Sequence, residues 1–433
     1  MWFFCADRPQ GDAHRGLFQA PTRQRDIDHG KAIFHFHIFL PHKAGWKLHK
    51  FHVEHSLDFS HCKQPPGDGD VHRFSPWGPQ ELNHMANSLG IPVAICPGRT
   101  GFLVVLFSLL LLVLILTSLS MGYIPLSWEE MVRVFLPGAE ELSSPRMETL
   151  TAVLFHVRLP RILTCAAVGG ALAVSGVIYQ GILLNPLADP YTLGVSAGAA
   201  LGAALALLLN LGAAPVSVPA FAFAGACATL FLVIFLSWEK QSPSGGLSSN
   251  NLILSGIMVG AILSAGISFL KFVANDQVSV IIFWLMGSFA SKTWPQFFLV
   301  AGFLVLGFAI ALFHARDLNL ISLGDRSALS LGVNLKQITL VLLITGSMLA
   351  AISVSVSGII GFVGLLVPHM IRFITGPDNR RLLPISMLSG AILLLGADTI
   401  TRAVLPHEIP IGVLTALIGG PVFCWIFKRN RLK

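Results

Sequence analysis

The sequence has very little charge. Only 12% of its 433 residues are Asp, Glu, Lys or Arg, whereas 54% are hydrophobic and 41 are glycine. Soluble domains carry about a quarter charged residues, so this composition places the chain among integral membrane proteins. The net charge of +7 does not indicate nucleic-acid binding, because lysine and arginine flank the apolar segments, where they act as topology signals.

Several chemical signatures are also missing. The six cysteines form no C-x-x-C pair, which argues against a zinc site or a disulfide framework. No G-x-x-x-x-G-K-[ST] phosphate loop is present, so ATP hydrolysis would have to belong to a partner. The apolar segments lack the histidine or acid clusters of a membrane-embedded enzyme. A second possible class, an ion-coupled secondary transporter, would need buried acids in broken helices. Only Asp189, which lies between two prolines, is placed in this way.

What the sequence does contain is a series of apolar segments near the length of about 20 residues that crosses a bilayer. We expect an all-α integral membrane protein with ten spans, at residues 101–121, 162–182, 192–210, 217–237, 252–272, 294–313, 337–356, 358–374, 384–403 and 410–427. An even number of spans returns the carboxyl end to the starting side. From Arg99 onward, cytoplasmic N- and C-termini place twelve basic residues inside and seven outside, which favours this orientation.

The first 98 residues differ from the rest, since they hold eleven of the fifteen histidines and no sustained periodicity. Two interpretations compete for "HFHIFLPHKAGWKLHKFHVEHSLDFSHC". One is a metal-binding tether with His35 and His37, or His52 and His55, as ligand pairs. The other is a disordered or spurious extension, with Met85 as the true start, and the irregular histidine spacing favours it. We therefore divide the chain into an extension, 1–98, and a transmembrane domain, 99–433.

Small residues recur at helical spacing within the apolar segments. The glycine series are Gly194, Gly198 and Gly202; Gly256 and Gly260; and Gly358, Gly361 and Gly364. Hydrocarbon gives helices no hydrophobic reason to associate, so close backbone approach through small residues must help to hold them together. The glycines therefore predict a dense bundle of many helices.

A half-polar stretch, "SLGDRSALSLGV" at 322–333, separates two of the predicted spans. It predicts a short amphipathic helix with Asp325 and Arg326 in the first turn and Gly332 at the end. The residues that we expect near one surface are Ala328, Leu329 and Leu331. Such a helix could bind in a socket on a soluble partner. Alternatively, the stretch could be an ordinary surface loop that lies on the lipid headgroups, and the periodicity does not decide between the two.

The stretch "LGDRSALSLGV" resembles the G-x-x-x-A-x-x-L-G loop of the FecCD-type permeases. Further segments resemble the family in the family's order, and together they cover about 100 to 433: 157–199, "FWLMGSFASKTW", "GIIGFVGLLVPHMIR", "GADTITR" and "EIPIGVLTALIGGPVF". The resemblance implies a type II ABC importer permease fold with about ten transmembrane helices. It also implies uptake of an iron-siderophore, haem or cobalamin by alternating access across the cytoplasmic (inner) membrane of a bacterium.

The resemblance further implies the partners. These are ABC ATPase subunits that bind ATP and magnesium, a periplasmic or lipid-anchored substrate-binding protein, and a second permease copy or paralogue, all assembled in membrane lipid. No cofactor is expected in the chain itself. The residues that would couple it to the ATPase are Gly324, Asp325, Arg326, Ala328, Leu331 and Gly332.

Three arginines are the candidates for docking the binding protein. Arg158 and Arg161 in "VRLPR" lie at the expected outer mouth of the second span, where Pro160 fits a first helical turn, and Arg402 closes "GADTITR". Arg158 and Arg161 could be snorkelling anchors. The resemblance instead implies that they receive glutamates of the binding protein, a task that suits the rigid, permanently charged guanidinium. Asp398 lies four residues before Arg402, spaced to pair with it.

Reversing two of these charges tests the docking assignment. We predict that Arg158→Glu together with Arg161→Glu abolishes uptake, because the outer face then repels the glutamates of the binding protein. The permease–ATPase complex should still assemble. Cargo uptake by cells or proteoliposomes is the measurement, and normal uptake by the double variant would refute the assignment.

Overall fold

The computed structural model describes residues 32–42, 45–55, 97–122, 127–135, 145–211, 216–239, 247–403 and 408–431. The chain forms two units, Met1–Pro79 and Gln80–Lys433. In the first unit, β1 (Ala32–His42) and β2 (Gly45–His55) form an antiparallel hairpin, whose register pairs His35 with His52. The side chains of this hairpin are not among those that the structure describes, so metal binding by these histidines stays a prediction.

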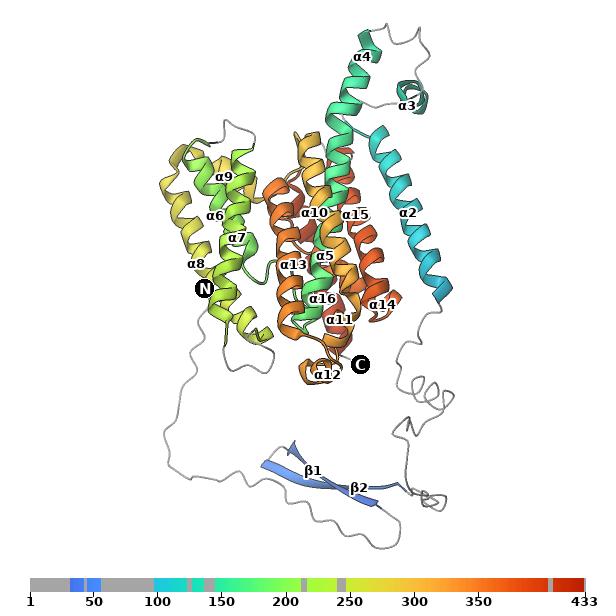
Figure 1. Cartoon of the computed structure of the whole chain (residues 1–433), viewed down its shortest axis with the longest axis vertical. Coiled ribbons are helices and arrows are strands. Elements are labelled where there is room, and N and C mark those ends of the chain that lie inside the picture. The colour runs from blue at the N-terminus through green and yellow to red at the C-terminus, as the bar shows by residue number, and fades with distance from the viewer. Residues whose placement is uncertain are drawn as a thin grey trace. The chain divides into compact units, whose positions relative to one another are not determined.

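The described part of the second unit is a helical bundle (Figure 1). Its apolar helices are α2 (Pro97–Ser120), α5 (Leu159–Ile182), α6 (Val195–Leu208), α7 (Ser217–Ser237), α8 (Ser249–Val273), α10 (Trp294–Phe313), α13 (Leu335–Ser357), α14 (Val363–Thr375), α15 (Asn379–Ala403) and α16 (Ile411–Arg431). Each lies on one of the ten predicted spans. Seven are long and apolar enough to cross a membrane, and α6, α14 and α16 are shorter apolar helices. The predicted all-α membrane fold is confirmed.

Shorter helices lie at the two ends of the bundle. They are α3 (Trp128–Phe135), α4 (Pro145–Ala152), the π-helix η2 (Val153–Arg158), the 3-10 helix η4 (Asn275–Gln277), α9 (Val278–Leu285), α11 (Ala315–Ile321) and α12 (Asp325–Ser330). Helices α3 and α4 mark one end, called here the α3 end (Figure 1). Helix α12 and the carboxyl end of α16 mark the opposite one, the α12 end.

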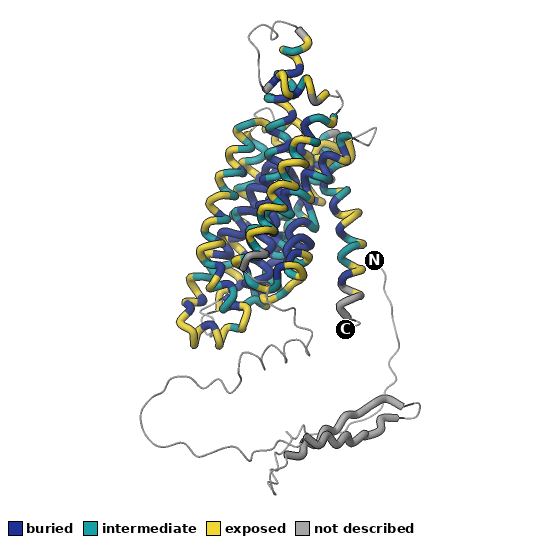
Figure 2. The backbone as a smooth tube through the Cα atoms, turned by 90° about the vertical axis from the view of Figure 1, so that its right-hand side faces the viewer, coloured by how far each residue is buried: buried dark blue, intermediate teal, exposed yellow. Residues whose placement is uncertain are grey.

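Helix α5 forms the centre of the bundle. Helix α5 belongs to the continuous helix Arg146–Ile182, and 89% of the apolar 18-residue window of this helix is buried inside the protein. The same share is only 11% for α2. A helix that is apolar all round and still buried must be enclosed by other helices, and α5 packs against α10, α13, α14 and α15. Figure 2 shows the same contrast, with buried backbone inside the bundle and exposed backbone on its outer side.

Glycine contacts bring α5 and its neighbours together. A Cβ atom added at Gly169 would lie 2.3 Å from the carbonyl oxygen of Gly390 on α15, and one at Gly176 would lie 1.8 Å from that of Gly364 on α14. Gly198 of α6 meets the carbonyl of Gly225 on α7 in the same way, at 2.5 Å. Most of the glycines that predict a dense bundle therefore do mark close backbone approach, although a Cβ at Gly361 would meet nothing within 4 Å.

The second span begins earlier than the sequence suggests. Residues Arg146 to Ile182 form one continuous helix, so Pro160 is not in its first turn. The π-helix η2 precedes this proline, and the amide of Leu159 donates to the carbonyl of Leu154, five residues back. A wider turn before a proline relieves the clash between its ring and the preceding turn. The helix therefore continues beyond the other helices at the α3 end (Figure 1).

Helix α3 is attached to α4, the first part of this long helix. A capping box opens α3, in which the Glu130 amide donates to Ser127 Oγ at 3.1 Å and the Ser127 amide donates to Glu130 Oε2 at 3.0 Å. Arg146 of α4 pairs with Glu130 at 2.8 Å. The amide of Ser127, followed by the Arg146 charge, lowers the pKa of Glu130 below its usual value.

Replacing one buried and one exposed glycine tests the packing. Gly176→Ala should lower stability by about 1–3 kcal/mol or more, because the new methyl group must push α5 away from α14. Gly302→Ala on α10, where a Cβ would meet nothing within 4 Å, should be neutral or stabilising by up to about 1 kcal/mol. Thermal unfolding of the two variants in detergent is the measurement, and equal effects would contradict the packing assigned to α5.

Candidate functional site

The structure places the six predicted coupling residues together at the α12 end. Helix α12 begins at Asp325, and both flanking glycines have positive φ angles, +98° at Gly324 and +83° at Gly332. The amide of Val333 donates to the carbonyl of Ala328 and that of Gly332 to Leu329, which is the Schellman pattern that ends a helix at glycine. The predicted end of the helix at Gly332 is confirmed. The two glycines are required by the backbone conformation, since a Cβ at either would meet nothing within 4 Å.

The prediction that Ala328, Leu329 and Leu331 lie near one surface of α12 is wrong. Ala328 is 0% exposed and packs with Ile321, Val333 and Leu335, so it holds α12 onto α11 and α13. The apolar groups that α12 and its flanks present to the outside are Leu323, Leu329 and Leu331. Successive residues of a helix are turned by about 100°, so Ala328 faces the bundle while Leu329 and Leu331, on either side of it around the helix axis, face away.

A hydrogen-bonded cluster fastens α11, and through it α12, to α15. The Asn319 side-chain amide donates to Asp378 Oδ1 at 2.7 Å, and the Asn379 side chain and backbone amide both donate to Asn319 Oδ1 at 2.8 Å. Leu318 packs beside Gly181 of α5, where a Cβ would lie 2.5 Å from it. Helix α12 is therefore attached through α11 to α5 and α15 and is not an independent loop.

The three predicted docking arginines meet at the α3 end. Two of them cap the carboxyl end of α2. The Arg158 guanidinium, on a residue that is 5% exposed, donates to the carbonyls of Leu119 and Ser120. Arg402 donates to the carbonyl of Met121 at 2.7 Å and to that of Ser118 at 2.9 Å. The last carbonyls of a helix lack partners within the helix and carry partial negative charge, so two guanidinium groups stabilise this terminus.

Arg161 has a different role, because it binds two carboxylates. Its Nε and Nη2 atoms donate to Asp398 of α15, the shortest bond being 2.9 Å. Its Nη1 and Nη2 atoms donate to Glu408 Oε1 and Oε2 at 3.0 and 3.3 Å. The side chain of Asp398 is 2% exposed and that of Glu408 is 51% exposed. The guanidinium therefore has one buried partner and one partner that reaches solvent.

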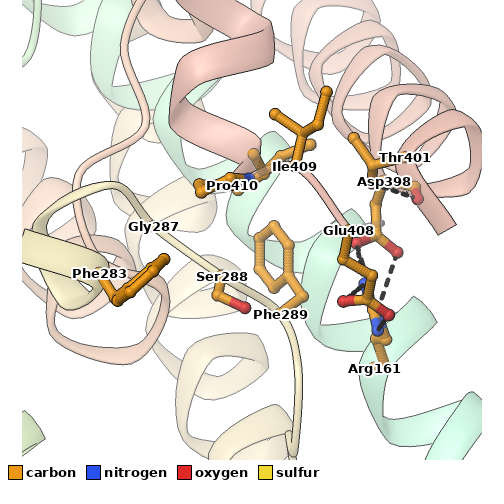
Figure 3. Close-up of a pocket in the computed structure, with 11 residues that line it drawn as sticks. Arg161, Phe283, Gly287, Ser288, Phe289, Asp398, Thr401, Glu408, Ile409 and Pro410 are labelled. Carbon is orange, nitrogen blue, oxygen red and sulfur yellow. Dashed lines mark hydrogen bonds and ion pairs between the residues drawn. The ribbon is translucent and has the colours of Figure 1, made fainter. Parts of the chain in front are cut away.

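A cavity of about 180 Å³ lies beside this ion-pair cluster (Figure 3). Its lining includes Arg161, Ser288, Phe289, Asp398, Thr401 and Glu408. Lys292 adds a further positive group in the loop before α10. Burial and the charge of Arg161 lower the pKa of Lys292 to about 8, so its amine is still mostly protonated at neutral pH. Two cationic groups, Arg161 and Lys292, thus accompany two carboxylates, Asp398 and Glu408, at this part of the α3 end.

Sequence spacing missed part of this arrangement. Asp398 and Arg402 do approach each other, but at 3.9 Å, and the main partner of Asp398 is Arg161, 237 residues away. Glu408 was not foreseen at all, although it lies only six residues after Arg402. An acid close to an expected arginine cluster at the end of a span was the signal that could have indicated it.

Asp189, the acid that kept ion-coupled transport open, has a structural role. Its carboxylate accepts the Tyr191 amide at 2.9 Å in the turn between α5 and α6, and the Tyr191 hydroxyl donates to the carbonyl of Ile360 at 2.9 Å. Among the side chains that the structure describes, no group of three or more His, Cys, Asp or Glu residues is placed to hold a metal ion. Among the described ion pairs, those that involve a buried carboxylate, Arg161–Asp398 and Arg402–Asp398, lie at the α3 end.

A multi-pass bundle with these two differentiated ends has the architecture of a membrane permease, and comparison with known proteins identifies its family. The model of the FecCD transport family matches residues 110–429. Hemin transport system permease protein HmuU of Yersinia pestis is 39% identical over 338 residues, which cover 76% of this chain and 95% of HmuU. Fe(3+) dicitrate transport system permease protein FecD of Escherichia coli is 38% identical over 330 residues, covering 76% and 99%.

A solved structure agrees with the family match. A metal-chelate type ABC transporter in an inward-facing conformation is similar with a TM-score of 0.66 and 34% identity, and the match covers 75% of this chain and 98% of the other. The chain belongs to the FecCD transport family. Its fold is that of a type II ABC importer permease, and it is a transmembrane permease subunit of such an importer.

The two carboxylates that bind Arg161 should differ in their effect on stability. Asp398→Asn should lower the free energy of unfolding by on the order of 3 kcal/mol, because a buried guanidinium loses its buried counter-charge. Glu408→Gln should lower it by about 1 kcal/mol at most, since that carboxylate is half exposed. Thermal unfolding in detergent measures both, and a larger loss for Glu408→Gln would contradict the roles assigned here.

Proposed function

We propose that this permease imports a chelated metal or a similarly bulky compound across the bacterial cytoplasmic (inner) membrane. Its binding protein would dock at the α3 end and its ATPase at the α12 end. The observation that carries the proposal is the position of two unlike contact sites at opposite ends of one bundle, the carboxylate-binding Arg161 and the exposed leucines around α12 (Figure 1). The α12 end, with both termini of the domain, then faces the cytoplasm, in agreement with the distribution of basic residues.

The α12 end suits an ATPase groove. Leu323, Leu329 and Leu331 are 65%, 44% and 59% exposed, and α12 lies beyond the ends of the long helices (Figure 1). Exposed leucines that cluster outside the hydrocarbon are typical of a protein contact. Gly324 and Gly332 fix the shape of the helix, Ala328 anchors it, and Asp325 and Arg326 are exposed beside the leucines. The partner ATPase would bind ATP and magnesium.

The α3 end suits an acidic side chain of a substrate-binding protein, periplasmic or lipid-anchored. Arg161 would receive the carboxylate directly, with Lys292 adding positive charge nearby. Arg158 and Arg402 would contribute through the charge that they hold at the end of α2. Because the Arg158 guanidinium lies against backbone carbonyls, a glutamate there would disturb packing as well as docking. A conservative change at Arg161 is therefore the cleaner probe.

The substrate class is taken from the relatives. HmuU is described as a hemin permease and FecD as an Fe(3+) dicitrate permease, and the solved neighbour is a metal-chelate type transporter. We therefore propose an iron-siderophore, haem or cobalamin-type compound. Two permease copies, or one copy with a paralogue, would enclose the path between them in membrane lipid. Reconstitution with the ATPase and binding protein encoded nearby should give uptake that requires ATP, and uptake without the ATPase would refute the proposal.

Charged substitutions at α12 test its side of the proposal. Leu329→Asp with Leu331→Asp should reduce co-purification of the ATPase at least tenfold, because carboxylates replace the apolar contact. Docking of the binding protein at the opposite end should be unchanged. Val132→Asp on α3, which replaces a residue of 56% exposure at the other end, is the matched control. A normal yield of the ATPase complex from the double variant would exclude α12 as the contact.

A further inference from the structure

The Arg161 guanidinium has no free edge for an incoming carboxylate. The edge formed by Nε and Nη2 binds Asp398 with three hydrogen bonds of 2.9 to 3.3 Å. The edge formed by Nη1 and Nη2 binds Glu408 with two, at 3.0 and 3.3 Å. Figure 3 shows both carboxylates beside the same guanidinium, joined to it by dashed lines. A bidentate contact with a partner requires that one of them leave.

The two carboxylates are not equally able to leave. Asp398 belongs to α15, its side chain is 2% exposed, and without Arg161 it would be a buried charge with only Arg402 nearby, at 3.9 Å. Glu408 lies in the segment between α15 and α16, and its side chain is 51% exposed. A half-exposed ion pair contributes at most about 1 kcal/mol, and a released Glu408 remains solvated. Arg161 therefore has a permanent partner, Asp398, and an exchangeable one, Glu408.

We propose that Glu408 is an internal competitor for docking, which occupies Arg161 in the free permease and is displaced by an acidic side chain of the binding protein. This proposal rests on the proposed function and assigns to Glu408 the control of docking affinity. The cavity of about 180 Å³ beside Arg161 and Glu408 provides space at this site for the incoming group. Glu408 thereby favours partners whose carboxylate is placed well enough to replace it.

Release of Glu408 would also act on the helix that follows it. The Ile411 amide donates to the carbonyl of Gly287 at 3.2 Å, and the Gly412 amide donates to that of Met286 at 3.0 Å. Gly412 itself is enclosed, since a Cβ there would lie 2.4 Å from the Ile359 carbonyl oxygen. The start of α16 is thus tied to the segment after α9, three residues beyond the exchangeable carboxylate. Displacement of Glu408 from Arg161 would therefore act first on these hydrogen bonds at the start of α16.

The affinity of the permease–ATPase complex for its binding protein tests the competitor. The probe is the substrate-binding protein encoded beside the permease, purified and loaded with cargo, and titrated against the complex in lipid nanodiscs. Glu408→Gln should bind it about fivefold more tightly, the factor that corresponds to removal of a competing surface ion pair. Glu408→Asp should gain affinity as well, by less, because the shorter side chain retains the charge but reaches Arg161 poorly.

Two controls separate competition from a general effect of charge. Glu129→Gln, an exposed acid on α3 at the same end, removes the same charge and should change affinity less than twofold. In an Arg161→Lys background the gain from Glu408→Gln should shrink, because an ammonium cannot hold two carboxylates through a planar fork. Unchanged or weaker binding by both Glu408 variants, with normal thermal stability, would overturn the proposal. Failure of the wild-type complex to bind the protein at all would instead overturn the proposed function.

Discussion

Close contact between helix backbones is the constraint on which the rest of the structure depends. A helix in hydrocarbon satisfies its own hydrogen bonds but gains nothing from hiding apolar side chains, so α5 can be held only by neighbours that approach it tightly. Gly169 against Gly390 and Gly176 against Gly364 provide that approach. Because α5 and α15 are locked together in this way, charged groups at their shared end have fixed positions.

The cluster at the α3 end follows from this packing. Arg161 on α5 and Asp398 on α15 meet where the two helices emerge, and their side chains are 12% and 2% exposed. Glu408 completes the cluster from a segment that is not part of either helix. The site thus combines a rigid pair with a third group whose attachment is weaker. This combination suits the proposed docking of the binding protein, which would form and break the contact in each transport cycle.

Much of the fold could be predicted from the sequence, because hydropathy reports directly on which segments lie in hydrocarbon. The ten predicted spans coincide with the ten apolar helices, and Gly332 ends α12 as expected. The early start of the second span was missed because η2 accommodates Pro160. The grouping of Ala328 with Leu329 and Leu331 on one surface was wrong because each residue turns the helix by about 100°, so that Ala328 faces inward and both leucines face outward.

The charged site was less predictable for a different physical reason. Four-residue spacing correctly brings Asp398 near Arg402, but the stronger contact of Asp398 is with Arg161, and no local pattern encodes a pairing across 237 residues. The arginines were found through their resemblance to a family motif. Their division of labour, with Arg158 and Arg402 capping α2 and Arg161 binding carboxylates, depends on tertiary structure alone.

The cap on α2 has a consequence for biogenesis. Arg402 reaches Ser118 from 284 residues downstream, and at about 5–20 residues per second a ribosome needs roughly 15 to 60 s to synthesise that stretch. During this time α2 must reside in the bilayer before its final neighbour exists. Its surface allows this, because only 11% of its apolar window is buried in the finished protein. Helix α2 is thus inserted early and secured late.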